Sequence, residues 1–325
     1  MKKFILFFFL FATYFNFAQI LPANRYAVNK LLLDIAPISP SFAYSLRKLK
    51  IGYTGFALKI RRNSDNAEAN VSFDDYNVVS ATSNVIVTNI GSSGLTLGQN
   101  LNYFTFIGSD LIYVVTWNDQ GPNLYNAVQL VFANQPQILL NVAGTANTLP
   151  SIIFNGSQIQ RLSINQPIEN LIGSGIKGTM MLVIKPTQNT NQLSFGYTDV
   201  SNTIKRWNTH INWSDGYCYF DASENCCVSN RRFFNTGSLN IYKQYSFIRS
   251  LTTKTARLNN NVTTLNNAIE PSTPLSGGTF SIGAWSEFPA TGYFGSCSEV
   301  ILFPNDFPVL DLSPLELNQI NFWQL

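Results

Sequence analysis

Short apolar runs, separated by Asn, Gly, Ser, Thr and Pro, fill most of the chain after about Leu31. The runs are rich in β-branched and aromatic residues and end at turn-forming residues, which is the pattern of β-strands. We expect strands at residues 85–87, 111–115, 152–154, 181–184, 217–220, 245–248 and 300–303. Many short strands with frequent turns predict an antiparallel β-sandwich or barrel.

Two segments carry helical signals instead. Residues 41–49 follow Pro40 and place Phe42, Leu46 and Leu49 at roughly helical spacing, which predicts a short amphipathic helix. At residues 313–317, a serine at the N-cap, a proline at the first helical position and an acidic residue in the first turn predict a second helix. This short C-terminal helix would carry the last apolar side chains back onto the sandwich.

The first residues have the pattern of an export signal. Two lysines precede an almost wholly apolar run over residues 4–17, which is followed by Ala18 and Gln19. A basic start, a short apolar core and a small residue near the end predict a signal peptide over residues 1–19. The alternative is an uncleaved membrane anchor, although the run is short for a spanning helix. We therefore expect an extracellular or cell-surface protein that meets a membrane only through this segment, if it is retained.

The composition excludes several classes of protein. Hydrophobic residues make up 45% of the 325 residues and charged residues only 12%, which excludes a disordered chain. After the N-terminus no apolar run approaches the roughly 18 residues of a spanning helix. Without Lys2 and Lys3, 19 basic residues face 18 acidic ones, so no charge field favours nucleic acid. The chain also lacks a Gly-rich phosphate loop and a metal-ligand cluster, so we expect neither a cofactor nor a metal.

Four cysteines favour disulfide bonds in an exported chain. They are Cys218, the adjacent pair Cys226 and Cys227, and Cys297. The adjacent pair could form a vicinal disulfide or bond to two different partners, and four cysteines allow three connectivities. Zinc is the weaker interpretation, because the one histidine, His210, is not spaced with the cysteines as in a zinc site.

The first half of the chain resembles a known family. Residues 43–49, 52–55, 61–66 and 116–120 carry ordered matches to the N-terminal part of the α-L-arabinofuranosidase B type catalytic module. Asn118 and residues 121–123 depart from that pattern. Modules of this type also occur in bacterial and phage surface proteins. A loop-like stretch at residues 141–150 predicts the boundary, so we expect one module over residues 20–145 and a second over 146–325.

The second half resembles a concanavalin A-like, or laminin-G-like, sandwich. Residues 153–157 are similar to its opening strand and turn, residues 206–221 to a segment common in such modules, and residues 280–303 to its closing strands. The fold that both resemblances imply is an all-β, concanavalin A-like jelly-roll sandwich with an associated, mostly-β N-terminal module. This agrees with the sandwich predicted from the strand pattern.

The resemblance also implies where catalytic carboxylates would lie. Retaining glycosidases need two carboxyl groups about 5–5.5 Å apart. In arabinofuranosidases of this type the nucleophilic Glu follows a Cys-Cys-Phe-Asp run, and the acid lies in a Gly-Gly-Asp loop. Here Glu224 follows Asp221 too early, and Glu287 lies near the second loop in a different register. Glu224 and Glu287 are the candidate pair, but neither catalytic position transfers cleanly. Asp221 and Glu224 could instead be turn residues, and Glu299 a strand residue paired with an arginine.

Aromatic residues offer a different function, because sugar sites combine a ring with a few placed polar groups. Trp213 and Asp215 are the leading candidates, joined by the nearby His210, Trp207 and Trp285. We expect a secreted, lectin-like protein that binds a glycan or cell-surface polysaccharide without cleaving it, with self-association or assembly into a larger particle as a further option. One alternative is a phage virion spike or receptor-binding protein on the virion surface. Another is an enzyme, in which case we expect a retaining glycoside hydrolase.

Overall fold

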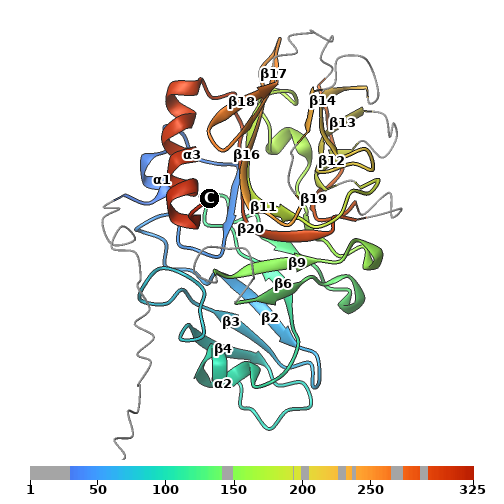
Figure 1. The fold of residues 1–325 in the computed structure, drawn as a ribbon. Helices are drawn as coiled ribbons and strands as arrows, with labels where there is room; N and C mark the ends of the chain where they lie inside the picture. The colour runs from blue at the N-terminus through green and yellow to red at the C-terminus, as the bar shows by residue number, and fades with distance from the viewer. Residues whose placement is uncertain are drawn as a thin grey trace, which may run out of the picture.

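The computed structural model describes residues 30–140, 149–192, 194–198, 205–225, 232–235, 239–264, 274–285 and 292–325. The expected signal segment and the expected boundary at residue 146 lie outside this range. The described chain is nearly all β, as the sequence predicts (Figure 1). Its helices are α1 (Leu32–Ile35), α2 (Tyr103–Ile107) and α3 (Val309–Trp323), with short 3₁₀ turns at Phe132–Asn134, Gly156–Gln158 and Ile168–Asn170.

Most of the strands before residue 146 form a small sheet. The strands of this region are β1 (Phe42–Ser45), β2 (Leu58–Arg62), β3 (Glu68–Val71), β4 (Asn84–Asn89), β5 (Asn100–Asn102), β6 (Ile112–Trp117), β7 (Ala127–Val128) and β8 (Gln137–Leu139). Antiparallel pairing gives the order β5–β4–β3–β2–β6. Strand β6 then pairs with both β7 and β8, and these two strands lead into the two layers of the sandwich.

The later strands form those two layers. They are β9 (Ser151–Phe154), β10 (Leu162–Ile164), β11 (Gly178–Pro186), β12 (Phe195–Thr198), β13 (Lys205–His210), β14 (Tyr217–Asn225), β15 (Arg232–Asn235), β16 (Lys243–Arg249), β17 (Lys254–Leu258), β18 (Asn261–Thr264), β19 (Phe280–Ile282) and β20 (Gly295–Phe303). One layer runs β7–β10–β19–β12–β13–β14–β15. The other runs β8–β9–β20–β11–β16–β17–β18, with β1 beside β9 along the same edge of β20.

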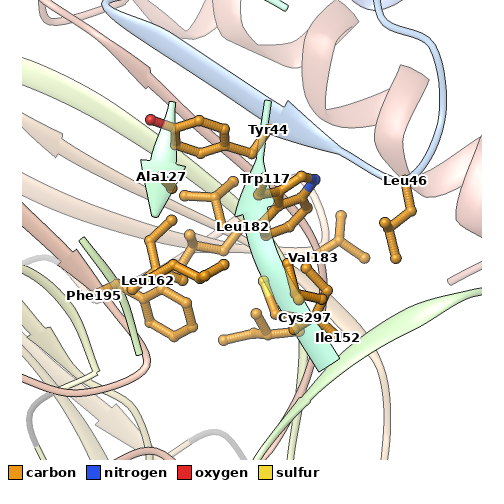
Figure 2. Packing of buried hydrophobic residues seen from close by; sticks show 14 of the residues in the cluster. Tyr44, Leu46, Trp117, Ala127, Ile152, Leu162, Leu182, Val183, Phe195 and Cys297 are labelled. Atoms are coloured by element: carbon orange, nitrogen blue, oxygen red, sulfur yellow. The ribbon is translucent and has the colours of Figure 1, made fainter. Parts of the chain in front are cut away.

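The core lies between these layers. Leu162 and Phe195 come from the first layer, and Leu182 and Cys297 come from the second (Figure 2). Ring contacts cross the same gap, with centroids 5.2 Å apart between Phe220 and Phe247. Burying such large apolar side chains is the main favourable term in folding. The jelly-roll type β-sandwich is confirmed, and strands form at all the predicted positions.

The predicted helix at residues 41–49 is wrong. Residues Phe42–Ser45 form β1, which pairs with β20. The reason is that Phe42, Tyr44 and Leu46 alternate into the sandwich core, while Ala43 faces a second cluster. Burial on both faces favours a strand over a helix. Strands from either side of residue 146 therefore pair directly, and the division into two modules stays a prediction.

The predicted C-terminal helix is confirmed but begins earlier. Helix α3 starts at Val309, so Pro314 lies within it rather than at its first position. Its buried residues Leu312, Leu315, Gln319 and Trp323 recur at helical spacing. Leu312 and Leu315 pack with Met181, Ile301 and Phe303, so the helix covers the outer face of the second layer (Figure 1). No helix among the described residues is long and apolar enough to cross a membrane.

Candidate functional site

The candidate site lies on the outer face of the first layer, on β13 and β14. Side chains alternate along a strand, so Trp207 faces the core while Arg206, Asn208 and His210 face outward. On β14, Asp221 faces outward for the same reason, between the core residues Phe220 and Ala222. The register places Asn208 opposite Asp221, which brings these polar groups together.

His210 is fully buried and bonded through both ring nitrogens. Its Nδ1 lies 3.1 Å from the carbonyl oxygen of Gln192, and its Nε2 lies 3.0 Å from Oδ2 of Asp221. A carbonyl oxygen can only accept, so Nδ1 carries a proton. His210 is therefore held rigidly in its site.

Asp221 links this histidine to an arginine. Nη1 of Arg206 lies 3.7 Å from Oδ2 of Asp221, which is fully buried. The Arg206 guanidinium also lies over the ring of Trp285, with its central carbon 5.5 Å from the ring centroid. Asp221 was one of the residues that the sequence allowed to be a turn residue. It is instead a strand residue with two cationic or hydrogen-bonding neighbours.

Trp213 and Asp215 lie in the turn between the two strands. The Trp213 N–H donates to the carbonyl of Tyr217, and the Gly216 N–H donates to the carbonyl of Trp213, each at 2.8 Å. The ring of Trp213 is half-buried and stands edge-on to His210, with centroids 5.2 Å apart. Asp215 is exposed and accepts bonds from the Tyr217 N–H and the Tyr219 hydroxyl. Trp213 thus extends the polar face with a partly accessible ring.

Two of the predicted aromatic ligand residues prove to be buried. Trp207 is fully buried, packs on Phe220, and donates from Nε1 to the carbonyl of Ile176. Its predicted contact with a ligand is wrong, because strand alternation turns it into the core. Trp285 is 2% exposed and takes part through its contact with Arg206. The structure therefore brings together His210, Trp213 and Trp285 and removes Trp207.

Other predicted residues fall largely outside the description. Glu287, Cys226 and Cys227 are not among the described residues, and of Glu224 only the backbone on β14 is described. Cys218 is buried on β14. Cys297 is a buried free thiol whose Sγ lies 3.9 Å from the carbonyl of Glu299, so the predicted disulfide at this position is wrong.

Arg206 belongs to the polar face of β13 and β14 and was not among the predicted site residues, although the sequence carries a signal for it. Arg206, Asn208 and His210 recur at every second position around Trp207, which indicates a strand with one polar face. That alternation groups Arg206 with His210. The partner Asp221 needs the β13–β14 register, which the turn fixes. Within the described parts of the chain, no three His, Cys, Asp or Glu side chains are grouped to hold a metal ion.

A separate cleft of about 1110 Å³ lies between α3 and the segment around α2. Its walls are mostly apolar and include Tyr103, Phe104, Ile138, Leu317 and Phe322. None of the predicted site residues lines it. Several of the residues that the sequence singles out lie instead on the polar face of β13 and β14 and in the turn between them.

Comparison with known proteins gives a likeness in fold. A scan against protein-family models finds no match, and a search of curated proteins finds none either. Among solved structures, an arabinofuranosidase in complex with arabinofuranosyl-α-1,2-xylobiose matches with a TM-score of 0.64 and 13% identity, over 90% of this chain and 65% of that one. A GH54 α-L-arabinofuranosidase soaked with a cyclic sulfate inhibitor matches with a TM-score of 0.60 and 12% identity, over the same shares. This chain thus spans about two thirds of the length of these enzymes and shares their fold.

Proposed function

We propose that the protein binds a carbohydrate, without cleaving it, at the outer face of β13 and β14. The observation that supports this is the grouping of Arg206, His210 and Asp221 between the rings of Trp213 and Trp285. The half-buried ring of Trp213 can lie against the apolar face of a sugar, while a few fixed polar groups hold its hydroxyls. The bonds among Arg206, His210 and Asp221 hold these groups in place before a ligand arrives, which reduces the entropy lost on binding.

The fold likeness suggests the first probe. The arabinofuranosidase that shares this fold was solved with arabinofuranosyl-α-1,2-xylobiose. We propose a neutral, arabinose-containing oligosaccharide as the ligand class to test first. A broad glycan array then covers other sugars.

The experiment is titration calorimetry of the full chain with this trisaccharide, preceded by the array. We expect saturable binding that Trp213→Ala weakens at least about tenfold, because the variant removes a half-buried ring at the site. Phe104→Ala is the matched control, since Phe104 is an exposed aromatic residue on α2. Unchanged binding in Trp213→Ala, or no binding by the wild type to any glycan, would overturn the proposal.

Hydrolysis is the second candidate function, favoured by the fold match that spans 90% of this chain. Glu224 and Glu287 are its candidate carboxylates. Incubating the same trisaccharide with the protein and measuring released arabinose tests it. We expect no release above a buffer blank. If arabinose is released, and Glu224→Gln or Glu287→Gln abolishes this release, the function is catalysis and not binding alone.

A further inference from the structure

A row of small and polar residues crosses the outer face of the first layer. Strand register places Asp221, Asn208, Gly196, Ser281 and Ser163 side by side on five successive strands, β14, β13, β12, β19 and β10. Their sequence neighbours, such as Trp207 and Phe280, point into the core. The row therefore continues the polar face of the candidate site toward β10.

Two members of this row have polar atoms without partners. Asn208 is fully buried, and neither its amide nitrogen nor its amide oxygen has a hydrogen-bond partner among the described residues. Ser281 is 1% exposed, and its hydroxyl is unpartnered within the same residues. Buried polar groups in proteins are almost always hydrogen-bonded, because losing water without compensation is costly. Among the described residues, both side chains thus lack the hydrogen-bond partner that a buried polar group needs.

Gly196 separates the two side chains. It has a φ of +145°, and a Cβ there would lie 2.3 Å from the Trp207 carbonyl oxygen and 2.6 Å from Cα of Asn208. Only glycine fits this backbone, so no side chain stands between Asn208 and Ser281. Two strand spacings separate them, which is roughly 10 Å. Ser163, at the far end of the row, is partly exposed.

We propose that Asn208 and Ser281 form a subsite that holds hydroxyl groups of the bound carbohydrate across Gly196. This inference rests on the proposed function and names the residues that select the ligand. An amide and a hydroxyl offer both donors and acceptors without charge, which matches the hydroxyls of a neutral sugar. Ordered water is the competing occupant, because it can satisfy the same groups.

Asn208→Leu separates these two occupants, because it removes both polar atoms and keeps the number and branching of the side-chain heavy atoms. If Asn208 serves the ligand, the variant keeps or raises the thermal midpoint, since an unpartnered amide has gone. Its affinity for arabinofuranosyl-α-1,2-xylobiose, measured by calorimetry, falls about 10- to 100-fold. Asn70→Leu, on the remote strand β3, is the matched control and should leave the affinity unchanged.

The outcomes distinguish the subsite from the proposed carbohydrate binding. Wild-type binding with unchanged affinity in Asn208→Leu would overturn this inference and leave the proposed function standing. Absence of wild-type binding would overturn both. If Asn208→Leu lowers both midpoint and affinity, Ser281→Ala decides, because it removes a single oxygen. A severalfold loss of affinity at an unchanged midpoint supports the subsite, and an unchanged affinity overturns it.

Discussion

Arg47 and Glu299 form a buried, two-pronged ion pair that joins the segment after β1 to β20. Nε of Arg47 donates to Oε2 at 2.7 Å and Nη2 donates to Oε1 at 3.1 Å, with Arg47 3% exposed and Glu299 fully buried. Gln319 and Trp323 of α3 donate to the same carboxylate, at 3.0 and 2.9 Å. One carboxylate thus ties the start of the described chain to its last helix, which covers the second layer.

Breaking this pair should destabilise the fold strongly. Glu299→Gln leaves the Arg47 charge buried without its counterion, which costs about 3–5 kcal/mol of unfolding free energy. Urea unfolding followed by tryptophan fluorescence measures it. Glu68→Gln is the control, because Glu68 pairs with Lys59 near the surface, where such bridges contribute about 0–1 kcal/mol. Equal losses in the two variants would contradict the assigned role of Glu299.

The same carboxylate makes stability depend on pH. Burial alone would raise the pKa of Glu299, but the Arg47 charge and the bonds from Arg47, Trp323 and Gln319 lower this pKa below its ordinary value. A carboxyl with a lowered pKa in the folded state stabilises above its unfolded pKa, and this contribution is lost as the pH falls through the folded value. The stability difference between wild type and Glu299→Gln should be full at pH 7 and narrow below about pH 4. A difference that stays constant on acidification would refute this.

Two tryptophans near the site should behave in opposite ways. Trp207→Ala empties a core position and should cost about 3–5 kcal/mol of unfolding free energy. Trp213→Ala removes a half-buried ring from a turn and should cost about 1 kcal/mol or less. Thermal unfolding of the two variants, side by side, measures both effects. A larger loss in Trp213→Ala would show that this ring is structural and would weaken its assignment to a ligand.

The thiol of Cys297 should be unreactive in the folded protein. It is fully buried, and burial raises its pKa well above the ordinary thiol value, with the nearby Glu299 charge adding to the effect. The thiolate is the reactive form, so iodoacetamide at pH 8 should leave Cys297 unmodified. After unfolding in guanidinium, alkylation of the peptide that contains residue 297 should be complete by mass spectrometry. Complete alkylation in the native state, or resistance to alkylation after unfolding without reductant, would contradict a buried free thiol.

Local sequence patterns predicted much of the fold, because strands such as β4 and β16 consist of short runs of β-branched or aromatic residues. The expected pairing of Glu299 with an arginine is also confirmed. The helix predicted at residues 41–49 failed because Tyr44, between Phe42 and Leu46, makes the apolar period two rather than helical. Pairing of β1 with β20 joins segments more than 250 residues apart in the chain, and no local pattern reveals such a partner.

Of the candidate site, too, the sequence predicted mainly residues that lie near one another in the chain. Trp213 and His210 stand near each other in sequence and in space. Trp207 was assigned to the wrong face, since composition alone does not show which way a strand residue points. Asn208 and Ser281 are more than 70 residues apart in the chain, and the register of β13, β12 and β19 places them in one row on either side of Gly196. That relationship exists only once the sheet is assembled.

A crystal structure of the protein soaked with arabinofuranosyl-α-1,2-xylobiose would show whether the sugar binds beside Trp213. We expect sugar density against the ring of Trp213, with hydroxyls within hydrogen-bonding distance of Arg206. Density confined to the cleft between α2 and α3, or no density at a saturating concentration, would contradict it.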